Sequence, residues 1–161
     1  MTDIDACFAE GRCACDGVRY RMISSPLFVH CCHCHWCQRE TGSAFVLNAM
    51  IESDRVVLTK GNPCKVMIPS ESGNGQQMVR CPDCQTALWS HYAGIGEKVS
   101  FVRAGTLDDP SLAPPDIHIF TSTKLPWVQL PQDIPAVREY YRRSDYWPEA
   151  SIARVKKATG R

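Results

Sequence analysis

Seven of the ten cysteines in this chain lie in short motifs whose spacing suits soft metal ions. Two of these motifs, Cys13-Ala14-Cys15 and Cys81-Pro82-Asp83-Cys84, are chelating pairs flanked by strand-like sequence. Together they supply four thiolates, which is a complete tetrahedral shell for zinc. A tight Cys-Pro-x-Cys turn also directs backbone N–H groups toward the sulfurs. We therefore expect Cys13, Cys15, Cys81 and Cys84 to bind a structural zinc that closes a long loop and adds to the free energy of folding.

A third motif, Cys32-x-Cys34-x-x-Cys37, lies within the ligand-rich stretch HCCHCHWCQR at residues 30–39. No second short pair remains elsewhere in the chain to complete its shell. A zinc with three protein ligands keeps a position for water or substrate, which is typical of a catalytic metal. Two other interpretations stay open at this point. One is an iron–sulfur cluster, for which four cysteines are usual. The other is a structural zinc with a fourth ligand from His30, His33, His35 or Cys31.

The charge of a three-thiolate centre indicates its chemistry. Three thiolates on Zn²⁺ leave a net charge of about minus one, so the metal polarises water less than a three-histidine zinc does. Such a centre is better suited to holding sulfur, and a thiol bound there would be deprotonated into a nucleophile at neutral pH. The favoured reaction is addition of a thiol to a small aldehyde, or the reverse cleavage of a carbon–sulfur bond.

Length and composition indicate one domain, residues 1–161, without a polyanionic partner. The chain carries 18 Lys plus Arg against 17 Asp plus Glu, so its field does not favour nucleic acid or an anionic membrane. The start, Met1–Cys7, is acidic where a secretory signal would be basic and then apolar, and no apolar run is long enough to span a bilayer. We expect a cytoplasmic protein, in which the cysteines stay reduced and available for metal.

The elements that position these motifs are predicted to be mainly β. Short apolar or alternating segments rich in β-branched and aromatic residues predict strands, and Gly-, Pro- and Asn-containing turns separate them in the manner of a sandwich or open barrel. A short helix is expected at Ile134–Arg143, with Pro135 in its first turn and the tail beyond it fraying. The predicted strand segments are Val18–Met22, Phe45–Leu47, Arg55–Leu58, Lys65–Ile68, Ala87–Trp89, Val99–Val102 and Ile117–Phe120.

Four motifs follow one another in a fixed order along the chain. They are GRCACDGVRY at 11–20, CHCHWCQRETG at 32–42, CPDCQTAL at 81–88 and GTLDDP at 105–110. In order and spacing this series resembles the glutathione-dependent formaldehyde-activating enzyme family. The resemblance covers about 11–135 as a family-like core and leaves the C-terminal helix and tail, 134–161, outside it.

The resemblance implies a fold of zinc-stapled antiparallel β-sheets with two zinc ions per chain. It places a structural zinc on Cys13, Cys15, Cys81 and Cys84, and an exchangeable, catalytic zinc on Cys32, Cys34 and Cys37. It also implies that the thiol of glutathione binds at the second zinc. In the family's namesake reaction, formaldehyde and glutathione combine into S-hydroxymethylglutathione, and the reverse reaction is that of a carbon–sulfur lyase. We therefore expect a zinc-dependent carbon–sulfur lyase or thiol–aldehyde adduct-forming enzyme.

The sequence departs from the family pattern at three positions, where Asp16 and Gln85 replace glycines and Gln38 replaces an arginine. The last change matters most, because arginine recognises the carboxylates of glutathione best. A surface arginine is more often a solvated charge. The remaining candidate anchors are Arg39, which we assign to substrate binding, together with Arg80 and Arg103.

Two histidines are candidate catalytic residues. His33 alternates with the cysteines and could be a metal ligand, a proton shuttle or a packed loop residue. His118 lies in an apolar strand, where a histidine is ordinarily a satisfied structural residue, although a strand face that meets the active cleft would make it a general acid or base.

Two alternatives to an enzyme of this type remain. The same motifs occur in the centromere protein V domain, so the chain could be a non-catalytic zinc domain used for binding, although its near-neutral charge speaks against nucleic acid. The second alternative is a redox sensor that releases zinc when Cys31 and Cys32 oxidise. Adjacent cysteines, however, form a disulfide of unfavourable geometry.

Overall fold

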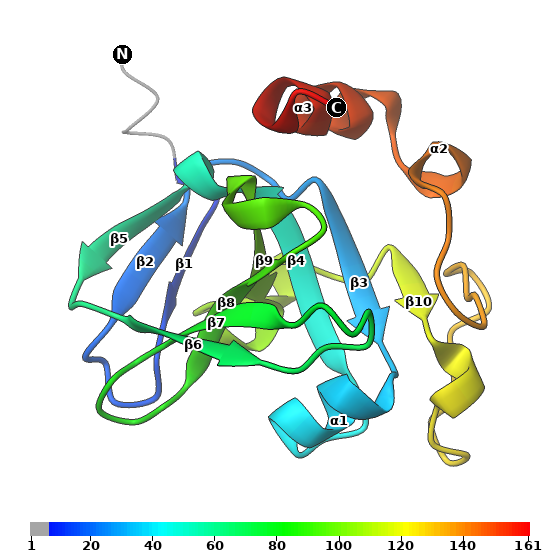
Figure 1. Ribbon diagram of the computed structural model, residues 1–161, viewed down its shortest axis with the longest axis horizontal. Helices are drawn as coiled ribbons and strands as arrows, with labels where there is room; N and C mark the ends of the chain where they lie inside the picture. Colours follow the sequence, from blue (N-terminus) through cyan, green and yellow to red (C-terminus); the bar gives the residue numbers. More distant parts are fainter. Residues whose placement is uncertain (1–6) are drawn as a thin grey trace.

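Two β-sheets form the framework of the protein (Figure 1). The computed structural model describes residues 7–161, and this part of the chain contains ten strands and three short α-helices. The predicted mainly β fold is confirmed, and the described strands form an open arrangement rather than a closed barrel. The predicted domain 1–161 begins in residues 1–6, which lie outside the described range together with most of the acidic start.

The smaller sheet is antiparallel and has the strand order β1-β2-β5. Gly11 on β1 lies opposite Tyr20 on β2, and a Cβ atom at Gly11 would come within 2.3 Å of the tyrosine ring. Only glycine therefore allows the buried Tyr20 ring to cross the neighbouring strand at this point. The three strands are β1 (Ala9–Arg12), β2 (Arg19–Met22) and β5 (Val56–Lys60).

The larger sheet has the order β10-β3-β4-β9-β8-β7-β6, and its pairs are antiparallel except that β10 runs parallel to β3. Its central strands β3, β4 and β9 are nearly or wholly buried, as expected for strands covered on both faces. The seven strands are β3 (Phe28–Cys32), β4 (Val46–Glu52), β6 (Cys64–Ile68), β7 (Gln76–Arg80), β8 (Ala87–Tyr92), β9 (Val99–Arg103) and β10 (Ile117–Ile119).

Each face of the larger sheet has its own core. Residues directly opposite one another in antiparallel strands share a face, so Phe28 on β3 and Phe101 on β9 lie on the same side, both opposite Met50 of β4. This side packs against Trp147 and Val155 from the C-terminal segment. The opposite side packs against the smaller sheet, in a cluster that includes Val29, Ala49, Val102, Tyr20 and Met22.

The predicted short C-terminal helix is present, but it spans Glu149–Thr159, and its predicted position at Ile134–Arg143 is wrong. This segment is irregular, with a single bridge at Ala136, and runs along the edge strand β10, where His118 N donates to Pro135 O at 2.8 Å and Val137 N donates to His118 O at 2.9 Å. The open sheet edge satisfies these backbone groups, which local helical periodicity did not reveal. The helices are α1 (His35–Thr41), α2 (Arg143–Tyr146) and α3 (Glu149–Thr159).

The C-terminal helix α3 lies at one end of the large sheet, away from α1 (Figure 1). None of the helices in residues 7–161 combines the length and apolar character needed to cross a bilayer. A two-bond ion pair attaches α3 to β4: Arg154 donates from Nε to Glu52 Oε1 at 2.9 Å and from Nη2 to Oε2 at 2.7 Å. The Glu52 side chain is only 7% exposed, so its charge depends on this partner.

Replacing Arg154 with alanine is expected to destabilise the protein by about 2 kcal/mol, since it leaves a buried carboxylate without its main partner. Urea unfolding followed by circular dichroism measures the change. Burial would raise the pKa of Glu52, but hydrogen bonds from Arg154 outweigh it and hold the pKa below its ordinary value. The stabilisation is therefore complete above roughly pH 4.3, the unfolded value, and is lost as pH falls through the lower folded pKa.

The matched control is Lys157→Ala, which removes an exposed charge from the same helix and is expected to change stability by less than about 0.5 kcal/mol. Equal stability of Arg154→Ala and the parent protein at pH 7 would contradict the importance of this pair.

Candidate metal centres and cavity

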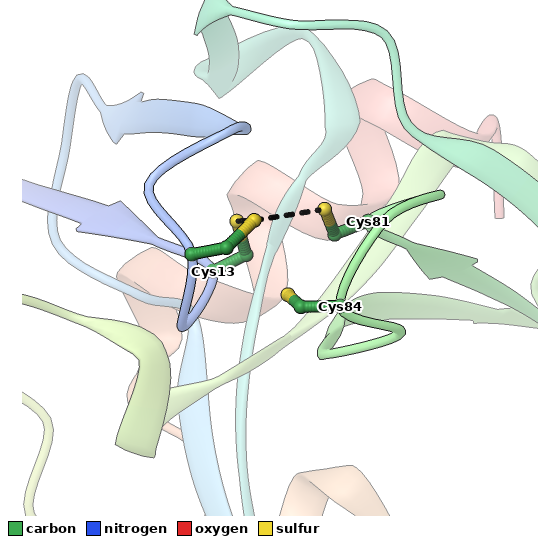
Figure 2. A group of neighbouring side chains, drawn as sticks. Cys13, Cys81 and Cys84 are labelled. Atoms are coloured by element: carbon green, nitrogen blue, oxygen red, sulfur yellow. Dashed lines mark hydrogen bonds between the residues drawn. The ribbon is translucent and has the colours of Figure 1, made fainter.

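The two cysteine pairs meet between the sheets. Cys13 follows β1, Cys81 follows β7, and the four sulfurs of Cys13, Cys15, Cys81 and Cys84 all lie within 4.8 Å of one another. Figure 2 shows the labelled side chains of Cys13, Cys81 and Cys84 converging from two loops. The sulfurs of Cys13 and Cys15 are 3.5 Å apart and those of Cys15 and Cys81 are 3.7 Å apart. A tetrahedron with 2.3 Å zinc–sulfur bonds has edges of about 3.8 Å, so the donor set fits a tetrahedral metal ion.

Backbone and hydroxyl groups support this cluster from outside. Val18 N donates to Cys13 Sγ at 3.2 Å, and the sulfur of Cys84 lies 3.1 Å from Thr86 Oγ1. Hydrogen bonds from the Thr86 side chain and backbone lower the pKa of Cys84 to about 5. Because the thiolate is the form that binds metal, these contacts prepare the cluster for an ion.

Two of the departures from the family pattern occupy the turns of these pairs. Asp16 and Gln85 each follow the second cysteine of a pair and have φ values of 63° and 60°. This left-handed conformation favours glycine. Asp16 forms ion pairs with Arg19 and Lys60, and the Gln85 amide donates to Pro82 O at 2.8 Å. These side-chain contacts therefore stabilise a left-handed turn conformation that glycine would adopt without strain.

The triplet Cys32, Cys34 and Cys37 forms a second sulfur cluster at the junction of β3 and α1. Cys32 ends the strand, Cys34 caps the helix and Cys37 lies in its first turns, with Cys37 N donating to Cys34 Sγ at 3.4 Å. The three sulfurs are buried and within 4.8 Å of one another. Hydrogen bonds from the thiols of Cys32 and Cys37 lower the pKa of Cys34 to about 3. These residues could hold a metal ion.

No fourth protein ligand joins this triplet in the described chain. Among residues 7–161, no further Cys, His, Asp or Glu ligand atom lies within 4.8 Å of all three sulfurs. The three cysteines instead line a cavity of about 510 Å³, a volume typical of small-molecule sites. Five aromatic side chains contribute to its walls: Trp36, Tyr92, Phe101, Phe120 and Tyr140. Phe120 holds a left-handed backbone conformation with φ of 53°, a strain that is common at functional sites.

A polar row crosses the three central strands beside this triplet. His30 lies opposite Asn48, and Asn48 lies opposite Arg103, whose Nη1 donates to Asn48 Oδ1 at 2.5 Å. Arg103 is only 5% exposed, and its Nε and Nη2 have no hydrogen-bond partner in residues 7–161. A buried guanidinium needs an opposite charge. The Cys32 thiol and the Arg103 charge lower the pKa of Cys37, but the hydrogen bond with Cys34 and burial raise it to about 12. A metal ion on the three thiolates would leave net negative charge here, which is the opposite charge that Arg103 lacks.

A third group, Cys31, His33 and His118, lies on the other face of β3. The sulfur of Cys31 is 3.5 Å from His33 Nε2, which is 3.0 Å from His118 Nδ1. Burial lowers the pKa of His33 to about 4 and also lowers that of His118, so both rings are neutral at pH 7. Their outer nitrogens have no partner in the described chain, whereas a metal-bound histidine ordinarily donates from that atom. This group fits a metal less well than the thiol clusters do.

The structure separates some of the predicted site residues from the cavity. His33 and His118 do not line it, and their catalytic role stays a prediction. Arg39 is exposed on α1 and does not line it either, so its role in substrate binding also stays a prediction. Gln38 acts within the fold, because its amide donates to His33 O at 2.8 Å and Thr123 O at 3.0 Å.

Two further cavity residues are functional candidates: His30, which the sequence analysis considered only as a possible metal ligand, and Arg143, which it did not single out. His30 Nε2 is 2.5 Å from the Tyr141 hydroxyl, which accepts from Trp147 Nε1 at 2.7 Å. Burial lowers the pKa of His30 to about 3, so its ring is neutral. Arg143 reaches the cavity from the C-terminal segment. The ligand-rich stretch gave a signal for His30, but nothing local in the sequence indicated Arg143.

The fold and site define a class of two-sheet β protein with two cysteine clusters. One cluster has four cysteines and is closed, and the other has three and opens onto a cavity. Residues 8–123 match the family described as glutathione-dependent formaldehyde-activating enzyme, and the chain belongs to that family. A curated Halomonas elongata protein, whose name carries the same description, is 26% identical over 148 residues, covering 89% of this chain and 91% of the relative. A crystal structure of a Rhodobacter sphaeroides protein is 13% identical with a TM-score of 0.47, covering 80% of this chain and 99% of that one.

Proposed function

We propose that this protein forms or cleaves the adduct between a small thiol, such as glutathione, and a small aldehyde, such as formaldehyde, as a carbon–sulfur lyase. The observation that carries this proposal is the triplet of Cys32, Cys34 and Cys37, which lines a cavity without a fourth protein ligand in the described residues. Family membership supports the same substrates. A non-catalytic domain of the centromere protein V type would have no need for a ligand-sized cavity beside its thiols.

We further propose zinc as the metal, with two ions per chain. Cys13, Cys15, Cys81 and Cys84 would hold the structural ion, and Cys32, Cys34 and Cys37 would hold the second. When bound at the triplet, zinc supplies a site that lowers the pKa of a coordinated thiol. Arg103 would balance the charge of the three thiolates, which removes the cost of burying an uncompensated guanidinium.

The chain's own residues then serve the addition step. The thiolate sulfur attacks the aldehyde carbon, the carbonyl π electrons move to oxygen, and that oxygen takes a proton; the reverse step returns the proton and breaks the carbon–sulfur bond. His30 is the one imidazole among the cavity-lining residues. Because the Tyr141 hydroxyl accepts from Trp147, it can donate to His30 Nε2, which leaves the Nδ1–H of the neutral ring to donate a hydrogen bond to the developing alkoxide. The proton that the thiol loses on binding ends on that oxygen, and the reverse step returns it to sulfur.

Exchange NMR with ¹³C-formaldehyde and glutathione tests the proposed reaction. We expect the rate of adduct formation and breakdown to rise in proportion to added protein, by at least about tenfold over buffer. The control is Cys34→Ser, which removes a sulfur from the triplet while it keeps the four-cysteine cluster, and it is expected to lose the acceleration. An exchange rate independent of protein concentration would sink the proposal.

A further inference from the structure

One wall of the cavity comes from outside the family match. The match covers residues 8–123, whereas Tyr140 and Arg143 line the cavity from the segment that follows β10. The metal-binding motifs belong to the matched part, but this wall does not. Its side chains are therefore suited to decide which substrate this chain accepts.

Arg143 gives this wall its charge. It is the only Lys or Arg among the cavity-lining residues, and Glu71 is the only Asp or Glu. No ion pair links Arg143 to a carboxylate within residues 7–161. The neighbouring Arg142 differs: it pairs with Asp145 at 3.3 Å, and its side chain is 85% exposed. A cation that borders a small-molecule cavity without an ionic partner is available to an anionic ligand.

The wall that carries Arg143 is a cluster of packed aromatic side chains. The guanidinium lies over the Trp147 ring, 5.3 Å from its centroid, and Trp147 stacks on Phe28 of β3. Trp147 also donates to Tyr141, which stacks on Tyr140. Tyr141 in turn contacts His30 beside the sulfur triplet. Arg143 is thereby positioned with low entropy cost before any ligand arrives.

We propose that Arg143 forms a carboxylate-binding subsite, so that the substrate is a small thiol that carries a carboxylate. This inference rests on the proposed function, which places the substrate sulfur at the triplet. A planar carboxylate matches the fork of N–H donors on a guanidinium. The cavity of about 510 Å³ accommodates a thiol of tripeptide size such as glutathione. Arg143 then supplies the guanidinium for carboxylate recognition that is missing at position 38, where Gln38 replaces the arginine of the family pattern.

Isothermal titration calorimetry on the zinc-loaded, full-length protein tests this subsite with three probes. Glutathione carries both thiol and carboxylates, its diethyl ester lacks free carboxylates, and S-methylglutathione lacks the free thiol. We expect Arg143→Gln to weaken glutathione binding about tenfold or more, the effect of losing a charge-assisted hydrogen bond pair. The same change should leave affinity for the diethyl ester within about twofold. Arg142→Gln is the matched control and should leave all affinities unchanged.

Two outcomes would overturn the subsite. One is unchanged glutathione affinity in Arg143→Gln, and the other is equal weakening of glutathione and its diethyl ester. Arg143→Lys keeps the charge and should bind glutathione more tightly than Arg143→Gln. This second variant keeps the proposal testable if Arg143→Gln does not fold. S-methylglutathione separates the two proposals. If it binds the parent protein as tightly as glutathione, the sulfur is not engaged and the proposed function fails, whereas a loss of its binding in Arg143→Gln would still support the subsite.

Discussion

Replacing Cys81 with serine should cost more than about 4 kcal/mol of stability and leave the protein unfolded or molten at 37 °C. Cys81 is fully buried and lies in the cluster of four sulfurs that joins the loop after β1 to the loop after β7. The free energy of metal binding to such a cluster adds to the free energy of folding, by about 10–16 kcal/mol in small zinc-finger peptides. Loss of one ligand removes much of this contribution. Thermal unfolding followed by circular dichroism, with metal content by mass spectrometry, measures the effect.

The matched control for this change is Cys64→Ser. Cys64 lies on β6 and belongs to none of the metal-type groups in residues 7–161. We expect its replacement to keep both metal ions and to change stability by less than about 1 kcal/mol. Retention of the parent melting temperature and of both ions in Cys81→Ser would show that this cluster does not staple the fold.

Replacing Cys34 with serine should reduce catalysis at least about a thousandfold and remove one metal ion while the fold persists. Cys34 is one of the three cysteines among the cavity-lining residues. It is also the N-cap of α1, accepting from Cys37 N, and serine is a preferred N-cap. The helix therefore keeps its cap while the thiolate is lost. The exchange NMR assay and metal analysis measure the two losses, and circular dichroism checks the fold.

Cys31→Ser is the control that separates the cavity from its surroundings. Cys31 lies next to the triplet in sequence, but it contacts His33 on the other face of β3. We expect this variant to keep both ions and most activity, because its sulfur is not in the three-sulfur cluster. Full activity in Cys34→Ser, or loss of a metal ion in Cys31→Ser, would show that the metal centre does not consist of Cys32, Cys34 and Cys37.

The sequence predicted those strands whose apolar pattern is local. It missed β1, β7 and β3, the last because its residues Phe28–Cys32 combine histidine and cysteines in a fully buried strand that does not alternate. The helix expected at Ile134–Arg143 failed for a related reason: Val137 and its neighbours bond to the edge strand β10, a tertiary partner that periodicity cannot show. The real helix at Glu149–Thr159 has a weak apolar stripe and is fixed by Arg154 and Val155.

The metal-type clusters were predictable because a chelating pair is set by covalent spacing alone. Cys13, Cys15, Cys81 and Cys84 needed only two tight turns to present their sulfurs. The residues around the triplet depend instead on strand register and on a distant segment. Arg103 meets Asn48 because β9 pairs with β4 in one particular register. Arg143 reaches the cavity because the C-terminal segment returns across the sheet, and no spacing rule predicts that.

Cadmium-113 NMR of the cadmium-loaded protein, recorded with and without glutathione, tests the exchangeable metal directly. Two resonances are expected, one from each cysteine cluster. Glutathione should leave the resonance of the four-cysteine cluster in place and shift the other toward the position of an all-sulfur shell. A single resonance, or two resonances that glutathione leaves unmoved, would contradict an exchangeable metal on Cys32, Cys34 and Cys37.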